Sequence, residues 1–220
     1  MSRPRNRVKP IIRPGRELKL SGDSILIVCE GEKTEPEYFK DLKKQWKINP
    51  IQIHITGKCG SAPISVVERA EEILQETEMK FDQIWCVFDR DNHKSFDQAI
   101  DKAKTINENI RKNNEDNDVD NIQTFNIAFS IPCFEIWFLL HFKYSAKPFN
   151  KGAEIIKEIK KQDKKYTKSK PNHELLFKKL EDAIKNTDKL RRSNIKSGRE
   201  NPYTDIDLLV KEIQNIKHTS

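Results

Sequence analysis

Residues Ser24–Cys29 read SILIVC, a short and almost entirely apolar run. A run of this length and hydrophobicity is typical of a β-strand that is buried on both faces, as in a parallel sheet. A helix should follow it, because two parallel strands need a crossover connection. Residues 34–37 (TEPE) have the spacing of a capping box with proline in the first turn, which predicts a helix over residues 35–47.

The alternation of strand and helix continues along the chain. Further strands are expected at residues 51–56 (IQIHIT), 83–88 (QIWCVF) and 123–129 (QTFNIAF), the first of these with the alternating pattern of an edge strand. Phe134–Phe142 (FEIWFLLHF) is apolar almost all round, which predicts a short buried helix. Successive strand-then-helix units predict an α/β fold of the Rossmann-like kind, with a mostly parallel sheet flanked by helices.

The chain divides into three expected parts. Residues 1–20 form a basic tail that we expect to be disordered, because its arginines alternate with prolines. Residues 21–142 form the α/β domain. Residues 143–220 show no further strand pattern and are rich in lysine, with apolar residues at helical spacing, so we expect a helical region packed on that domain.

Composition excludes several classes of protein. The 220 residues are 35% hydrophobic and 34% charged, and no apolar run approaches the roughly 20 residues of a membrane span. Met1 is followed by arginines rather than by an apolar signal segment. The four cysteines stand far apart, without a CxxC pair, so no zinc or redox motif is present. These features predict a cytoplasmic protein that does not enter a membrane.

Charge is distributed unevenly along the sequence. The formal net charge is +6 over residues 1–20, −8 over residues 21–142 and +11 over residues 143–199. An acidic centre between two basic blocks is expected where carboxylates bind a cation and the flanks attract a polyanion, for which nucleic acid, RNA or DNA, is the natural candidate. The alternative is that the lysine-rich helices are simply solvated.

Acidic side chains directly follow two of the predicted strands. Glu30 and Glu35 come after the first strand, and Asp89 and Asp91 end the strand at residues 83–88. Ligands of open α/β sheets bind beyond the carboxyl ends of the strands. The two aspartates of an extended Asp-x-Asp lie on the same side of the chain, and a glutamate from an adjacent strand would complete a cluster. Because carboxylates repel one another, the cluster predicts a bound Mg²⁺ or Mn²⁺.

Structural interpretations of these acids remain open. Glu35 can serve only to complement the N-terminus of its helix, and Asp89 and Asp91 can be ordinary loop acids. Gly31, which lacks a Cβ, would let a phosphate or metal approach the backbone closely.

Four further residues are secondary candidates. Lys33 and Arg90 are placed to stabilise negative charge in a transition state. His93 is a candidate proton shuttle, with surface exposure as the alternative. Glu135 enters the apolar helix, where a buried charge must be paired or metal-bound, and His141 is its candidate partner.

Several of these motifs together resemble a known family. The runs ILIVCEGEKTE and VFDRD resemble a Toprim domain, the magnesium-dependent fold of topoisomerases, primases and OLD-type nucleases. CEGEKTEPEYF, VFDRDNH and SIPCFEIWFLLHF together are similar to the RloB or AbiLii-like proteins associated with phage resistance and restriction loci. The resemblance spans about Ser24 to Phe142, with a weaker echo in NPYTDIDLLV.

The resemblance implies roles for individual residues. Glu30 corresponds to the Toprim glutamate, which acts as general acid or base or joins the metal shell, and Asp89 and Asp91 correspond to the metal-binding aspartates. Glu35 matches the second acid of OLD-like members. Topoisomerases tend to have a third acid where this chain has His93, which disfavours a topoisomerase.

These observations lead to two hypotheses of different classes. The first is a magnesium-dependent nuclease of a phage-defence system, controlled by a partner ATPase. The second is a non-catalytic nucleic-acid-binding module with a structural magnesium site. Phosphoryl or nucleotidyl transfer is a weaker third option, because the sequence lacks a nucleotide-binding GxxxxGK[ST] motif.

Overall fold

The computed structural model describes residues 24–50, 52–57, 59–60, 62–77, 79–90, 94–117 and 123–219. The basic tail predicted at residues 1–20 lies outside these ranges.

A five-stranded sheet forms the centre of the molecule. Its strands are β1 (Ile25–Cys29), β2 (Ile53–Thr56), β3 (Gln83–Asp89), β4 (Thr124–Ile131) and β5 (Tyr203–Thr204), in the order β2-β1-β3-β4-β5. The first four strands are parallel, and β5 pairs antiparallel with β4. The predicted α/β fold with a mostly parallel sheet is confirmed, and β2 is an edge strand as its alternating pattern indicates.

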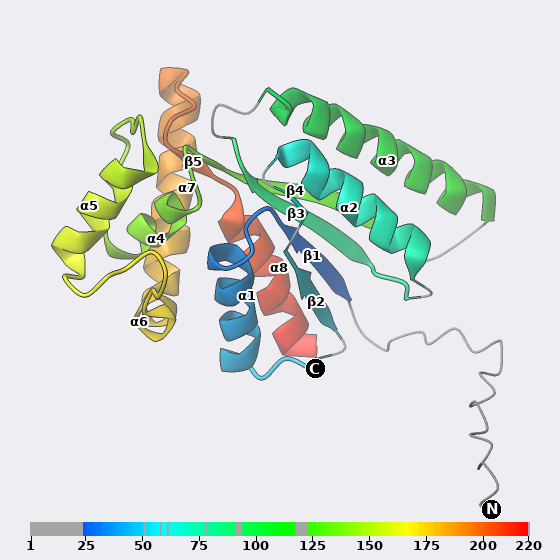
Figure 1. Cartoon of the computed structure of the whole chain (residues 1–220), viewed down its shortest axis with the longest axis horizontal. Coiled ribbons are helices and arrows are strands. Elements are labelled where there is room, and N and C mark those ends of the chain that lie inside the picture. The colour runs from blue at the N-terminus through cyan, green and yellow to red at the C-terminus, as the bar shows by residue number, and fades with distance from the viewer. Residues whose placement is uncertain are drawn as a thin grey trace, which may run out of the picture.

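Helices cover both faces of the sheet (Figure 1). One face is covered by α2 (Pro63–Glu76) and α3 (Phe96–Asn117), and the other by α1 (Thr34–Gln45) and α8 (Ile206–Thr219). Strand β1 is buried throughout because its side chains alternate between two apolar cores, with Ile25 and Ile27 in one and Leu26 and Val28 in the other.

The remaining helices, α4 (Glu135–Phe142), α5 (Gly152–Gln162), α6 (His173–Lys178) and α7 (Leu180–Ser197), lie beyond one end of the sheet. Helix α4 is the predicted apolar helix and is buried from Glu135 to His141, because α5 and α7 pack against it. Its core is continuous with the core beneath α1 and α8.

Two local predictions are wrong. Helix α1 begins at Thr34 with Lys33 as N-cap and no side-chain cap hydrogen bond, so residues 34–37 do not form a capping box. A strand does return after Lys143, because β5 pairs with the end of β4. A two-residue strand is too short to produce a periodic pattern, and its position depends on contacts with distant residues.

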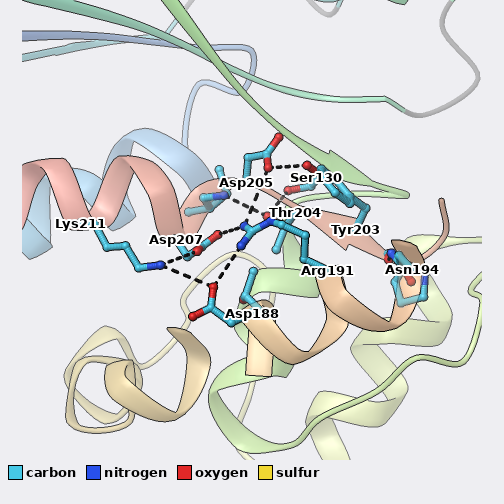
Figure 2. Close-up of polar contacts among 12 residues, drawn as sticks. Ser130, Asp188, Arg191, Asn194, Tyr203, Thr204, Asp205, Asp207 and Lys211 are labelled. Atoms are coloured by element: carbon cyan, nitrogen blue, oxygen red, sulfur yellow. Dashed lines mark hydrogen bonds and ion pairs between the residues drawn. The ribbon is translucent and has the colours of Figure 1, made fainter. Parts of the chain in front are cut away.

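Strand β5 is anchored by buried polar contacts (Figure 2). The hydroxyls of Thr204 and Ser130 are 3.0 Å apart, and the backbone N–H of Asp205 donates to the carbonyl of Phe129. The Asp207 side chain is fully buried and accepts hydrogen bonds from Arg191 at 2.7 Å and Lys211 at 3.0 Å. The NPYTDIDLLV segment therefore joins α7 and α8 to the edge of the sheet.

We expect Asp207→Asn to lower the free energy of unfolding by roughly 2 kcal/mol, because it removes the charge of a fully buried carboxylate that accepts hydrogen bonds from two cations. Asp101→Asn is the matched control, since Asp101 pairs with Lys104 on the surface of α3 and its loss should cost less than about 0.5 kcal/mol. Urea denaturation of both variants makes the comparison. Equal, small losses would contradict a stabilising role for the buried network.

Candidate functional site

The carboxyl ends of β1 and β3 are joined by two hydrogen bonds. The backbone N–H of Glu30 donates to the carbonyl of Val87 at 2.9 Å, which continues the parallel pairing by one residue. The backbone N–H of Asp89 donates to Glu30 Oε2 at 2.9 Å. Glu30 and Asp89 are therefore neighbours, as their positions at the ends of adjacent strands predict.

Glu35 reaches back to the same edge from the first turn of α1. Its side chain is buried, with 8% of the residue exposed, and its carboxylate lies against Gly31. A Cβ at Gly31 would stand 2.1 Å from Glu35 Oε2, so a larger residue there would displace this carboxylate. The space at Gly31 that was expected for a phosphate or metal is taken in this structure by Glu35.

Glu135 approaches from a third direction, at the start of α4. The residue is 1% exposed, and its carboxylate forms an ion pair with Lys168 at 2.8 Å. Lys168 lies in the connection between α5 and α6, and 60% of its side chain is exposed. A solvent-facing ammonium thus covers a buried carboxylate.

These four acids interact electrostatically, and we call Glu30, Glu35, Asp89 and Glu135 the acid cluster. Burial, together with the negative charges of Glu135 and Glu30, raises the pKa of Glu35 to about 6. Burial is also the largest cause of the raised pKa of Asp89, which lies well above its usual range. The carboxylates of the other cluster members raise the Asp89 pKa further, while Lys168 partly opposes both shifts.

The acid cluster has the donor chemistry of a site for a hard cation. Carboxylate oxygens are the ligands that Mg²⁺ prefers, and all four acids are buried or half-buried. Within the described ranges, no three His, Cys, Asp or Glu side chains are gathered closely enough to hold a metal ion as they stand. Asp91, the second predicted aspartate, lies outside those ranges, as does His93.

The predicted cations lie on different sides of the strand ends. Lys33 is exposed at the N-cap of α1. Arg90 follows Asp89 but points to the opposite face of the sheet, where its guanidinium lies 2.5 Å from Glu200 and 5.1 Å from the ring centre of Phe96. Successive side chains of a strand alternate between faces, so Arg90 is kept apart from the acid cluster.

One predicted pairing is wrong. His141 does not contact Glu135, because its Nδ1 lies 2.8 Å from the carbonyl of Trp137 and its ring packs edge-on against the Trp137 indole. Burial lowers the pKa of His141 to about 3, so the imidazole is neutral. A buried neutral ring offers no counter-charge to a carboxylate.

Comparison with protein families decides the classification. Residues 25–213 match the family model described as RloB-like protein. The chain belongs to the RloB-like family. No curated protein and no solved structure matches it. Among the described helices of this RloB-like chain, none has the length and hydropathy that a membrane span needs.

Two residues near the acid cluster were not found from the sequence. Lys168 stands among the many lysines of residues 143–199, and nothing in the run KYTKSKP separates it from its neighbours. Cys133 lies beside Glu135, and burial together with the charges of Glu135 and Asp89 raises its thiol pKa. Both depend on the packing of the helical region against the strand ends, which no local pattern reveals.

Because its carboxyl pKa is raised, Glu35 should destabilise the folded state near neutral pH. The native protein retains a proton on Glu35 that the unfolded chain releases, so stability falls as the pH rises from about 4.5 to about 6. Glu35→Gln removes the charge and keeps the shape. We expect it to raise the free energy of unfolding by about 2 kcal/mol at pH 7.5 and to change little at pH 4.

Glu37→Gln is the control, since Glu37 is exposed in the same first turn of α1. Denaturant unfolding at the two pH values measures the effect. A Glu35→Gln protein that is less stable than wild type at pH 7.5 would show that the carboxylate is compensated by groups other than those described.

Proposed function

We propose that this protein is a metal-dependent nuclease with a Toprim-like fold, which hydrolyses phosphodiester bonds of RNA or DNA in a phage-defence system. The observation that carries the proposal is the convergence of acids from distant parts of the sequence on one edge of a parallel sheet. Ligands of such sheets bind at this edge. Carboxylates that lie close together repel one another and lower the stability of the fold, and such unfavourable arrangements are typical of functional sites.

The residues proposed to hold the metal are Glu30, Glu35 and Asp89, with Asp91 from the adjoining segment. Glu135 is added to this set, because it raises the pKa of both Glu35 and Asp89 and therefore belongs to the same electrostatic site. Mg²⁺ or Mn²⁺, when bound, supplies charge neutralisation of the scissile phosphate and a lowered pKa for water.

Proton transfer is assigned to Glu35 or Glu30. A carboxyl with a pKa of about 6 is well matched to general acid–base chemistry near neutral pH, and Glu35 has that value because it is buried among like charges. Glu30 is positioned by the Asp89 backbone N–H, which holds one of its oxygens at the strand end. Whichever of the two glutamates does not bind the metal keeps a carboxyl group that can donate or accept a proton.

Cations around the acid cluster supply phosphate contacts. The ammonium groups of Lys168 and Lys33 are solvent-facing, and the former is already positioned over the acid cluster by Glu135. Helices α4–α7 lie beyond the end of the sheet (Figure 1), and most of the +11 charge of residues 143–199 lies in the segments that connect these helices. Contacts of this kind are independent of sequence and sensitive to salt.

The family supports the proposed biological setting. Membership of the RloB-like family is consistent with phage defence. We further propose control by a partner ATPase, because an unregulated nuclease would harm its own cell, and a cytoplasmic location, because the four cysteines are free thiols, as in a reducing compartment.

Asp89→Asn and Glu30→Gln should each reduce cleavage by about a hundredfold or more, because each removes a proposed metal ligand. Asp97→Asn, in the exposed first turn of α3, is the control and should cut as wild type does. Cleavage of tRNA, single-stranded DNA and duplex DNA is measured with Mg²⁺ and with Mn²⁺, in the presence and absence of the proposed partner ATPase.

Binding is measured on the same substrates in EDTA. The nuclease proposal expects salt-sensitive binding that survives both substitutions while cutting is lost. A wild-type protein that binds nucleic acid but never cuts it, with either metal and with the ATPase, would instead be the non-catalytic module with a structural magnesium site.

A further inference from the structure

A cavity of about 550 Å³ opens on the other side of the strand ends from the acid cluster. It lies between the edge formed by β4 and β5 and the C-terminal end of α7, and its lining includes Arg90, Phe129, Ile195, Arg199, Glu200 and Tyr203. No member of the acid cluster lines it. Its size is within the range of sites for small organic ligands.

One wall of the cavity is apolar and aromatic. The rings of Phe129 and Tyr203 are stacked, with centroids 4.9 Å apart and planes at 24°. Ile195, which also lines the cavity, is 78% exposed and adds apolar surface beside these rings. Flat aromatic groups, including nucleobases, pack favourably on surfaces of this kind.

The rest of the rim carries positive charge. Arg191 also lines the cavity, but Asp207 and Asp188 occupy its guanidinium. Among the described residues, Arg199 has no carboxylate partner, and Glu200 is the carboxylate that pairs with Arg90. That pair is exposed, at 37% and 71% of the two side chains, so an incoming anion can replace it at little cost. Two guanidinium groups are thus available to an anion, and their planar donors suit phosphate.

The walls are held rigidly by the contacts around β5 (Figure 2). The Tyr203 hydroxyl donates to Asp205 at 2.5 Å, and the Asn194 side-chain amide donates to the carbonyl of Pro202 at 2.8 Å. Gly198 ends α7 in the left-handed conformation, with φ of 65°, and this turns the chain so that Arg199 and Glu200 border the cavity. The aromatic wall would therefore lose little side-chain freedom when a ligand binds.

We propose that this cavity binds one nucleotide unit, with its base against Tyr203 and Ile195 and its phosphate at Arg199 and Arg90. The unit is either a free nucleotide or one residue of a nucleic-acid strand. Binding of a nucleic-acid strand rests on the proposed function, whereas binding of a free nucleotide does not. Arg90 directly follows Asp89, so a strand seated here would pass the edge that carries the acid cluster.

The test measures binding to the full chain in EDTA, so that no outcome depends on cleavage. The probes are the four ribonucleoside and four deoxyribonucleoside 5′-monophosphates, inorganic phosphate, and fluorescent eight-residue single strands of RNA and DNA. Arg199→Gln should weaken binding of a monophosphate by about tenfold, since it removes a charged hydrogen bond. Ile195→Glu should abolish binding by placing a negative charge at the rim. Both residues are exposed, so neither change threatens folding.

Arg192→Gln is the matched control, because Arg192 is exposed on α7, does not line the cavity and loses the same charge. Glu200→Gln should have the opposite effect and tighten binding roughly two- to fivefold, since it frees Arg90 from an exposed ion pair. A loss of single-strand affinity in Arg199→Gln and Ile195→Glu assigns the unit to a strand. A loss confined to the monophosphates assigns it to a free nucleotide.

Three results would overturn the assignment. Inorganic phosphate binding as tightly as the nucleotides would show that the aromatic wall contributes nothing. Equal effects of Arg199→Gln and Arg192→Gln would show non-specific charge attraction. Tighter binding of an acidic, tyrosine-containing peptide than of any nucleotide would show that the occupant is a protein. If the protein never cuts nucleic acid but binds a monophosphate in this cavity, the nuclease proposal is contradicted and the nucleotide site is supported.

Discussion

The hydrogen bond from the Asp89 backbone N–H to Glu30 joins the ends of the neighbouring strands β1 and β3, and it also places a carboxylate beside other carboxylates. Bringing Glu35 and Glu135 to the same edge costs free energy, as the raised pKa values of Glu35 and Asp89 indicate. The favourable terms that offset this cost lie elsewhere. Two apolar cores bury the faces of the sheet, and α4 is apolar nearly all round because it must fill the space between α1, α5 and α7. The acid cluster therefore lowers the free energy of unfolding, and the packing of the two apolar cores offsets this loss.

Gly31 shows how closely backbone and side chains are fitted there. The Glu35 carboxylate occupies the volume that any larger residue at position 31 would need. A carboxylate with a pKa of about 6 that is pressed against backbone rather than paired with a cation is readily drawn toward a divalent ion. Lys168 is the nearest cation to Glu135, but its long exposed side chain can leave without disturbing the core. The proposed metal would require these acids to move closer together, since no three of the described His, Cys, Asp or Glu side chains are grouped to hold one.

The sequence predicts the sheet and two members of the acid cluster well, and for a clear reason. Continuous apolar runs such as Ile25–Cys29 mark buried parallel strands, and strand ends in a parallel sheet share one edge, so Glu30 and Asp89 had to be neighbours. Features set by long-range packing could not be predicted. The pairing of Glu135 with Lys168 rather than His141, and the strand at Tyr203–Thr204, depend on how residues 143–219 fold back over the strand ends. The capping-box prediction is wrong because the helix begins at Thr34 itself, with Lys33 as N-cap, so Thr34 is not in the N-cap position.

The alternation of side chains along β3 gives the strand end two different chemistries. Asp89 faces the acids from α1 and α4, whereas Arg90 faces the aromatic cavity beside β5. A single strand crossing this edge would meet carboxylates suited to a metal on one side and guanidinium groups suited to phosphate on the other. Because the two residues are adjacent, any shift of the β3 end moves both sites together. The Arg191–Asp207 ion pair holds the segment that contains β5, and β5 pairs with the end of β4. Because β4 in turn pairs with β3, the packing of the C-terminal segment restrains the strand end that carries Asp89.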